Sequence, residues 1–159
     1  MPPKQSANKD TKPTGKDKFI YKNGSKYEGE YATLSQGIVR HGRGIYTEAL
    51  TNLDPYECPG IEPLEVNATI NQVFDGQWNN DQFESGTVTY PDGSRYEGTF
   101  DNEGNYAHGK YYFKNGEIWD GPFKACKMNG DGIFTDKAGK QWKCTMVDNQ
   151  CMAGVEIEE

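Results

Sequence analysis

A short motif, aromatic–x–Gly–x–aromatic, recurs along the chain and constrains its fold more than any other feature. The motif occurs as Tyr27–Tyr31, Phe74–Trp78, Tyr96–Phe100 and Trp119–Phe123, with starting positions 47, 22 and 23 residues apart. A degenerate copy, Trp142–Met146, follows after another 23 residues. Self-similarity at a period of roughly 20 to 50 residues is typical of repeat architectures. We therefore expect the chain to stack one small structural unit several times.

Each unit has the pattern of a β-hairpin. A turn dipeptide such as Asp92-Gly93 recurs with the same period, and Asn-Gly and Asp-Gly favour the positive φ values of a two-residue turn. In the strand that follows, alternation places Tyr96, Gly98 and Phe100 on one face. The glycine leaves room for a neighbouring ring to lie against bare backbone. The structural glycines expected at this position are Gly29, Gly76, Gly98 and Gly121.

The composition excludes a helical bundle. Leu, Ile, Val and Phe together account for only 25 of the 159 residues, and all four leucines precede residue 65. A bundle needs leucine or its equivalents along its core positions. Twenty aromatic residues remain to supply a core, because Tyr and Trp bury large surfaces. We expect an all-β fold, an elongated single-layer antiparallel sheet of stacked β-hairpins.

The repeats divide the chain into segments. Residues 1–18 contain five Lys and one large apolar side chain, so they are expected to form a disordered basic arm. Residues 19–146 form the repeat array, and residues 147–159 form an acidic C-terminal tail. Within the array, residues 47–72 replace a hairpin with a stretch of three prolines and five acidic residues. This stretch is either an insertion on the binding face or a drifted repeat with a decorated turn.

These residues resemble the MORN (membrane occupation and recognition nexus) repeat family. The segments YEGEY…HGRGIYT, FDGQW…ESGTVTYPDG, YEGTF…AHGKYYFKNG and WDGPF…MNGDGIFTDKAG follow its pattern of Tyr-x-Gly-x-Trp, Gly-x-Gly, a strand and Asp-Gly. Two departures stand out. Trp78 is the one Trp at a second aromatic position, and Pro122 falls within a strand, where it is tolerated at an edge or a bulge. The last unit lacks the glycine, as a terminal capping repeat does.

No set of residues has the spacing of an active site or a metal centre. Cys58, Cys126, Cys144 and Cys151 contain no CxxC pair, and we expect them to be reduced thiols rather than zinc ligands. Residues 104–111 approximate a phosphate-binding loop, but they end in Tyr and precede a strand pattern rather than a helix. We expect no enzymatic activity, no metal and no cofactor.

The titratable residues repeat with the unit. The carboxylates beside the repeat glycines are expected on the polar face of the sheet, and their regularity argues against a catalytic role. His41 and His108 each precede a glycine, and we interpret both as turn residues. The carboxylates in question are Glu28, Asp75, Glu97 and Asp120.

The ladder of aromatic residues has two interpretations. As structure, the rings pack between adjacent hairpins and hold the sheet together. As function, a single-layer sheet cannot bury both faces, so accessible rings would form a groove for an amphipathic helix or an extended peptide. The candidate residues of this groove are Tyr27, Tyr31, Phe74, Trp78, Tyr96, Phe100, Trp119 and Phe123.

Charge and targeting signals narrow the class of partner. Five Lys and two Asp give residues 1–18 a charge of +3. Because the net charge of the chain is −7, the remainder carries −10. An acidic body disfavours nucleic acid as a partner and also anionic membranes. No apolar run has the length of a transmembrane helix or of a signal-peptide core, so we expect a soluble intracellular protein.

The resemblance to MORN proteins implies a function. Proteins similar to this architecture occur as subunits of ciliary and flagellar axonemes, notably of radial spokes. The expected function is therefore a non-catalytic scaffold for protein–protein interaction, located in the cytoskeleton of a cilium or flagellum, with other axonemal or cytoskeletal subunits as partners. The alternative is a peripheral membrane or phosphoinositide-binding module, to which residues 1–18 would contribute.

Overall fold

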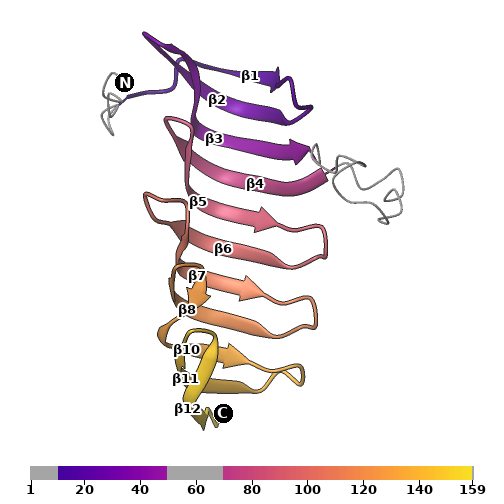
Figure 1. Cartoon of the computed structure of the whole chain (residues 1–159), viewed down its shortest axis with the longest axis vertical. Coiled ribbons are helices and arrows are strands. Elements are labelled where there is room, and N and C mark those ends of the chain that lie inside the picture. Colours follow the sequence, from indigo (N-terminus) through magenta and orange to yellow (C-terminus); the bar gives the residue numbers. More distant parts are fainter. Residues whose placement is uncertain (1–10, 50–69, 159) are drawn as a thin grey trace, which may run out of the picture.

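The computed structural model describes residues 11–49 and 70–158, which contain twelve antiparallel strands in one open sheet (Figure 1). The strand order follows the sequence, so each hairpin pairs with the next, as the repeat predicts. No helix in these residues is long and apolar enough to cross a membrane. The strands are β1 (Gly15–Ile20), β2 (Lys26–Leu34), β3 (Gly37–Ala49), β4 (Ile70–Asn79), β5 (Gln82–Thr89), β6 (Arg95–Phe100), β7 (Tyr106–Tyr112), β8 (Ile118–Lys124), β9 (Lys127–Met128), β10 (Gly130–Thr135), β11 (Gln141–Val147) and β12 (Gln150–Glu156).

The single-layer sheet expected from the sequence is confirmed. Glycines of neighbouring strands lie opposite one another, so they form a line across the sheet. A Cβ built at Gly98 would lie 2.6 Å from the Tyr96 hydroxyl and 2.7 Å from the Cα of Gly109. Glycine is required here because the ring and the neighbouring backbone occupy the space of a side chain. We call this line the glycine row; its paired members from β2 to β8 are Gly29, Gly44, Gly76, Gly86, Gly98, Gly109 and Gly121.

The three largest fully buried side chains, Tyr27, Tyr96 and Trp119, lie against glycines of the row. Tyr96 and Trp119 are fully buried, and the Tyr96 hydroxyl donates a hydrogen bond to the Thr99 carbonyl oxygen at 2.8 Å. The buried residues form two clusters. The N-terminal cluster contains Tyr27, Trp78, Phe83 and Val88, and the C-terminal cluster contains Trp119, Met128, Cys144 and Met146.

The turns that carry the glycine dipeptides are longer than predicted. In the loop from Tyr90 to Ser94, the Gly93 N–H donates to the Tyr90 carbonyl at 3.0 Å, and the Tyr90 N–H donates to the Ser94 carbonyl at 2.9 Å. Gly93 has a φ of 90°, whereas Asp92 is absent from the residues with positive φ. The prediction of a two-residue turn is therefore wrong. The loop is a three-residue connection in which a type I turn precedes a left-handed glycine.

Two-residue turns do occur, but on the opposite side of the sheet, at the other ends of the strands. Asn80–Asp81, Ala125–Cys126 and Asp148–Asn149 each have positive φ at both residues, which is the geometry of a type I′ hairpin turn. We call this side, to the left in Figure 1, the short-turn edge. The sequence analysis did not predict these three turns.

The strand β8 contains the proline noted in the sequence. It pairs with β10 through Ile118–Asp120 and with β9 through Phe123 and Lys124. Pro122 lies between these two stretches and thus faces the break between β9 and β10. Because proline cannot donate a ladder hydrogen bond, this position agrees with the expectation of an irregular strand.

The predicted segment boundaries need correction at the N-terminus. Residues 15–18, assigned to a disordered arm, belong to β1, where Lys18 lies opposite Glu28. Backbone pairing with β2 orders them despite their polarity, and Phe19 anchors the strand by packing against the N-terminal cluster. Within the predicted acidic tail, residues 150–156 form β12. The predictions for residues 1–10 and 50–69 lie outside the described residues.

Candidate functional site

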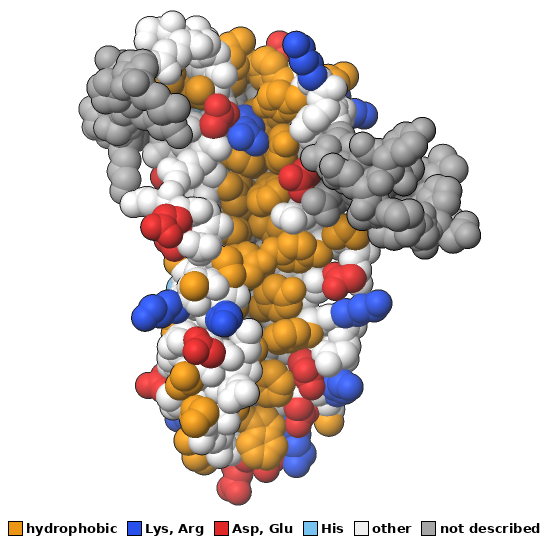
Figure 2. Space-filling model, viewed as in Figure 1, with side chains coloured by type: hydrophobic (Ala, Val, Ile, Leu, Met, Phe, Trp, Pro, Cys, Tyr) orange, Lys and Arg blue, Asp and Glu red, His pale blue; other side chains and the backbone are white. Residues whose placement is uncertain are grey.

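One face of the sheet carries a continuous apolar stripe along the length of the molecule (Figure 2). We call it the aromatic face. Its central line contains a large apolar side chain on every strand from β1 to β11 except β9, each opposite the next. These residues are Phe19, Tyr27, Tyr46, Phe74, Val88, Tyr96, Tyr111, Trp119, Phe134 and Trp142.

A second line of rings runs beside the first, closer to the short-turn edge. Trp78 contacts Phe83 with ring centroids 4.9 Å apart, and Phe83 contacts Phe100 at 5.0 Å. The line continues through Tyr106 to Phe123, with separations of 5.7 and 5.4 Å. These separations and the tilted or edge-to-face angles are favourable for aromatic pairs. The rings of β4 to β8 therefore form one connected surface.

The predicted groove residues all lie on this face, but burial divides them into two groups. Four have almost no exposed surface and serve as the floor of the sheet: Tyr27, Trp78, Tyr96 and Trp119. The other four are half-buried and present part of each ring to the outside: Tyr31, Phe74, Phe100 and Phe123. Only the second group has the accessibility that a contact with a partner needs.

Sequence reasoning missed the rings on the return strand of each hairpin. Tyr46, Tyr111 and Phe134 each stand two residues after a glycine of the return strand. The pattern Gly–x–aromatic was therefore visible in the sequence beside the motif that was used. Among these rings, Tyr111 is half-buried and lines a hollow of the stripe.

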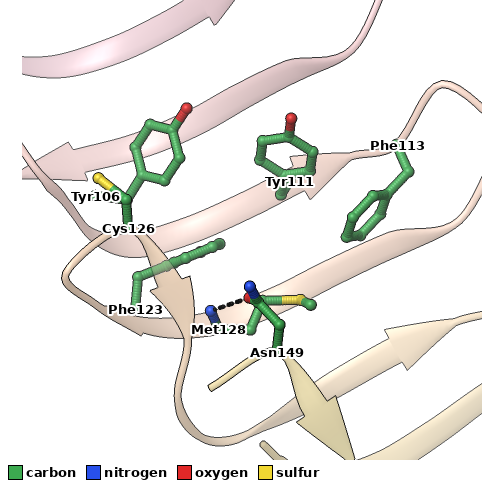
Figure 3. A pocket seen from close by; sticks show the side chains of 7 residues that line it. All are labelled: Tyr106, Tyr111, Phe113, Phe123, Cys126, Met128 and Asn149. Atoms are coloured by element: carbon green, nitrogen blue, oxygen red, sulfur yellow. Dashed lines mark hydrogen bonds between the residues drawn. The ribbon is translucent and has the colours of Figure 1, made fainter. Parts of the chain in front are cut away.

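One hollow of the stripe is a pocket of about 570 Å³ near the C-terminal cluster. Figure 3 shows β7 and the residue after it contributing three rings, while the remaining side chains come from β8, β9 and the short-turn edge. Asn149 closes one side, since its Oδ1 accepts a hydrogen bond from the Met128 N–H at 2.8 Å. The pocket carries no ionised side chain. Its lining residues are Tyr106, Tyr111, Phe113, Phe123, Cys126, Met128 and Asn149.

The Cys126 thiol at the pocket rim is not activated. Its Sγ lies 3.4 Å from the Asn105 Oδ1, to which it donates a hydrogen bond. Burial, with a smaller contribution from the Asp101 carboxylate, raises the pKa of Cys126 above its ordinary value. A raised pKa disfavours the nucleophilic thiolate. The pocket is therefore lined by apolar side chains, an amide and a protonated thiol.

A second hollow, of about 310 Å³, lies on the N-terminal half of the stripe and is charged. The Arg40 guanidinium stacks on the rings of Tyr46 and Trp78, 4.6 and 4.3 Å from their centroids. Arg40 Nε also lies 3.0 Å from Asp81 Oδ1 in an ion pair. Glu48 and Glu103 complete the charged residues of the lining, so acidic groups outnumber the single cation.

The tyrosines beneath the stripe are neutral hydrogen-bond donors. Burial raises the pKa of Tyr27 and that of Tyr96 to about 12. For Tyr27 the Arg40 charge opposes this shift without cancelling it. Each hydroxyl donates to a backbone carbonyl three residues later in its own strand, Glu30 or Thr99. Each of these bonds lies at the register shift that follows the glycine of its strand.

The repeated carboxylates lie on the opposite face, as predicted, although exposed Ile45 lies beside Asp75 there. Asp75 Oδ1 lies 2.6 Å from Arg43, and Asp120 Oδ2 lies 3.6 Å from Lys110. Glu28 and Glu97 pair in the same way with Lys18 and Arg95. Exposed pairs of this kind contribute little to stability. They form a solvated ladder without a convergent site.

The two histidines lie in strands, so their prediction as turn residues is wrong. His41 is buried in β3, where its Nδ1 accepts a hydrogen bond from the Asn80 N–H at 3.2 Å. Its Nε2 then carries the proton and donates to the Thr11 carbonyl oxygen. His108 is exposed in β7 opposite Thr99. The two histidines therefore have different surroundings and form no pair.

The short-turn edge is held by a repeated pair of hydrogen bonds that the sequence analysis missed. The Arg40 N–H donates to Asp81 Oδ1 at 2.8 Å, and the Asp81 N–H donates to the Arg40 carbonyl at 2.9 Å. Met128 and Asn149 repeat this exchange at 2.8 and 3.1 Å. The turn tips are therefore fixed beside the stripe and act as one wall of the groove.

No group of three or more His, Cys, Asp or Glu side chains that could hold a metal ion occurs in residues 11–49 and 70–158. Comparison of the sequence with protein-family models and with curated proteins gives no match. The resemblance to MORN repeats therefore stays a prediction from the residues quoted above.

Proposed function

We propose that this protein is a non-catalytic scaffold whose aromatic face binds an amphipathic helix of a partner protein. The observation that carries the proposal is the continuous stripe of half-buried rings on a sheet with no second layer in the described residues (Figures 1 and 2). A large apolar surface of this kind marks an interaction site. The opposite face, with its ion pairs, has the character of ordinary solvent-exposed surface.

The shape of the stripe favours a helix lying across the strands. The second line of rings and the charged hollow extend from β3 to β8, which is five strand spacings or about 24 Å. A helix of about 16 residues covers the same length. Its apolar side would follow the rings, and one large side chain would enter the pocket at Tyr111 as an anchor.

Charge further defines the partner helix. The charged hollow contains Glu48, Asp81 and Glu103 against Arg40 alone, whereas the pocket at Tyr111 contains no ionised group. A helix with a Lys or Arg near the first hollow and a bulky apolar residue at the pocket matches this distribution. Electrostatic complementarity of this kind fixes the orientation of the bound helix.

The assembly that contains this scaffold is proposed from the resemblance to MORN repeats. On that basis the protein is a structural subunit of a ciliary or flagellar axonemal complex, such as a radial spoke. A rigid sheet with one binding face suits such a role, because it positions a partner without chemistry of its own.

Two neighbouring tyrosines of β7 provide a matched test. Tyr111 faces the stripe, and its hydroxyl donates to Ser94 Oγ at 3.3 Å. Tyr112 faces the other way, under the Arg95 guanidinium at 3.7 Å, and its hydroxyl donates to Glu97 at 3.2 Å. We expect Tyr111→Ser to lower recovery of the partner at least about tenfold in affinity capture from ciliated cells. Tyr112→Ser should capture as the wild type does.

The controls separate the possible outcomes. Circular dichroism must show the same folded fraction for both variants. Equal capture by both variants would remove the aromatic face as the binding site. Recovery with axonemal subunits supports the assembly, and recovery with unrelated proteins contradicts it. Flotation with phosphoinositide-containing vesicles, with and without residues 1–18, tests the membrane alternative, and binding to vesicles without any protein partner would replace the scaffold proposal.

A further inference from the structure

The glycine row changes at the C-terminal edge of the sheet, where two thiols meet. On β11 the position of the glycine is taken by Cys144, which lies opposite Gly132 of β10 and Gly154 of β12. Cys151 lies on β12, where its partner is Met146. The sulfur atoms of Cys144 and Cys151 both lie 3.3 Å from one point, the position that a Cβ of Gly154 would occupy. The absence of a side chain at Gly154 therefore leaves a shared space for the two thiols.

The two thiols differ in their surroundings. Cys144 is only 6% exposed, whereas Cys151 is exposed on the edge strand. Burial, together with the adjacent Cys151 thiol, raises the pKa of Cys144 to about 11. The thiolate is the nucleophile in reactions with peroxides. An oxidant from solution therefore reaches Cys151 first, while Cys144 lies beside it as a protonated thiol.

We propose that Cys144 and Cys151 are an oxidation site that hydrogen peroxide converts to a disulfide. In the first step the Cys151 thiolate attacks one peroxide oxygen, the O–O bond breaks, and Cys151 becomes a sulfenic acid as the leaving oxygen departs as water. In the second step the Cys144 sulfur attacks the sulfenic sulfur, an S–S bond forms, and the hydroxyl leaves with the Cys144 proton as water. Two thiols and one peroxide thus give one disulfide and two waters, and a dithiol reductant reverses the change.

The disulfide would act on an exposed edge strand. All seven residues of β12 are exposed, and β12 pairs with β11 alone. A covalent bond between the two strands limits the freedom of β12 to detach. The reaction therefore determines how firmly the C-terminal edge of the sheet stays paired. This inference is independent of the proposed helix-binding function.

The sequence provides a direct readout. No Lys or Arg follows Lys143, so trypsin releases residues 144–159 as one peptide containing both cysteines. After treatment of the intact protein with hydrogen peroxide and then iodoacetamide, we expect this peptide to lose the mass of two hydrogens and to remain unalkylated. Hydrogen exchange at the β12 amides should slow at least about threefold, because local opening of the strand is restricted. Dithiothreitol should reverse both changes.

Variants at each thiol make the outcome decisive. Cys126→Ser should form the disulfide as the wild type does. Cys144→Gly restores the glycine row while removing the second thiol, so Cys151 should then proceed to sulfinic acid. Alkylation of both cysteines in the treated wild-type protein would overturn the proposal, as would Cys151 sulfinic acid or a disulfide to Cys58, to Cys126 or between two chains.

Discussion

The two halves of the sheet share a backbone plan but fill it with different side chains. In the N-terminal cluster the buried residues are mainly aromatic, with Tyr27, Trp78 and Phe83 in mutual or shared ring contact. In the C-terminal cluster three of the four buried residues contain sulfur, and Trp119 is the one fully buried ring, with half-buried rings packed against the cluster. Within the described chain, the ring-to-ring contacts lie between residues 19 and 123. The repeat is therefore defined by its glycines, and the side chains that fill it are exchangeable.

This difference also determines how each half responds to change. Rings have few rotamers and pack at fixed angles, whereas Met is unbranched and adapts to irregular gaps. The pocket lies at the junction, since it joins Tyr106 and Tyr111 to Met128. We infer that the packing of the N-terminal half is more rigid than that of the C-terminal half.

The largest expected effect comes from removing one indole in each half. Trp78 Nε1 donates to the Gly44 carbonyl at 3.1 Å, and Trp119 Nε1 donates to the Pro122 carbonyl at 3.3 Å. Each Trp→Ala change should lower the free energy of unfolding by about 3–5 kcal/mol. Trp119→Ala should lie at the lower end, because Met128 and Met146 can partly fill the cavity. Urea unfolding measures both, and a greater loss for Trp119→Ala would show that the C-terminal half does not adapt.

These buried positions also show how much the sequence could reveal. Two markers in one register, the aromatic motif and the turn dipeptide, were enough to predict the hairpin array and the ring-on-glycine packing, because each unit uses the same local geometry. Turn length could not be read from Asp92-Gly93, because the same dipeptide suits a two-residue turn and a type I turn followed by a left-handed glycine. β1 was missed because its order comes from pairing with β2, which the composition of residues 1–18 does not show.

The candidate site was only partly accessible to sequence reasoning. The motif located the stripe, but it could not separate buried Tyr96 from half-buried Phe100, since both occupy the same face of β6. The pocket depends on Asn149, which reaches Met128 only because Asp148–Asn149 forms a type I′ turn. The position of this turn directly after β11 could be read from the sequence. That Asn149 bonds to Met128 of another hairpin could not.

An intermediate effect is expected along the glycine row. Gly98→Ala places a methyl group 2.6 Å from the Tyr96 hydroxyl and 2.7 Å from the Gly109 Cα, and should cost about 1–3 kcal/mol. Gly154→Ala is the matched control on the edge strand. Its nearest atoms are the sulfurs of Cys144 and Cys151 at 3.3 Å, so the loss should stay under about 0.5 kcal/mol. Equal losses in thermal or urea unfolding would mean that the row has the same role at the edge as at the centre.

The smallest effect concerns the loop carboxylates. Hydrogen bonds from the Ser94 side chain and backbone lower the pKa of Asp92. For Asp136, desolvation acts in the opposite direction, but hydrogen bonds from Trp142 and the loop N–H groups prevail and lower the pKa. Because the folded-state pKa lies below the unfolded value of 3.8, this stabilisation is present above that pH. It is lost as the pH falls through the folded-state pKa.

Substitution separates the two carboxylates. Asp92→Asn and Asp136→Asn keep an acceptor oxygen but remove the titrating group, so each should flatten the fall in melting temperature between about pH 5 and pH 2. The change should be the greater for Asp136→Asn if the contact of Asp136 Oδ2 with Trp142 Nε1, at 3.2 Å, links the loop to the C-terminal half. Melting curves identical to the wild type at every pH would show that neither loop contributes.

Because each strand pairs only with its neighbours in the order of the sheet, this molecule can change its length by whole repeat units. One additional unit of about 23 residues would add two strands and thus about 10 Å, while every existing contact stays as it is. Duplication of one repeat in the gene can therefore lengthen the protein in equal steps of about 10 Å. Each step would also extend the aromatic stripe by the same length.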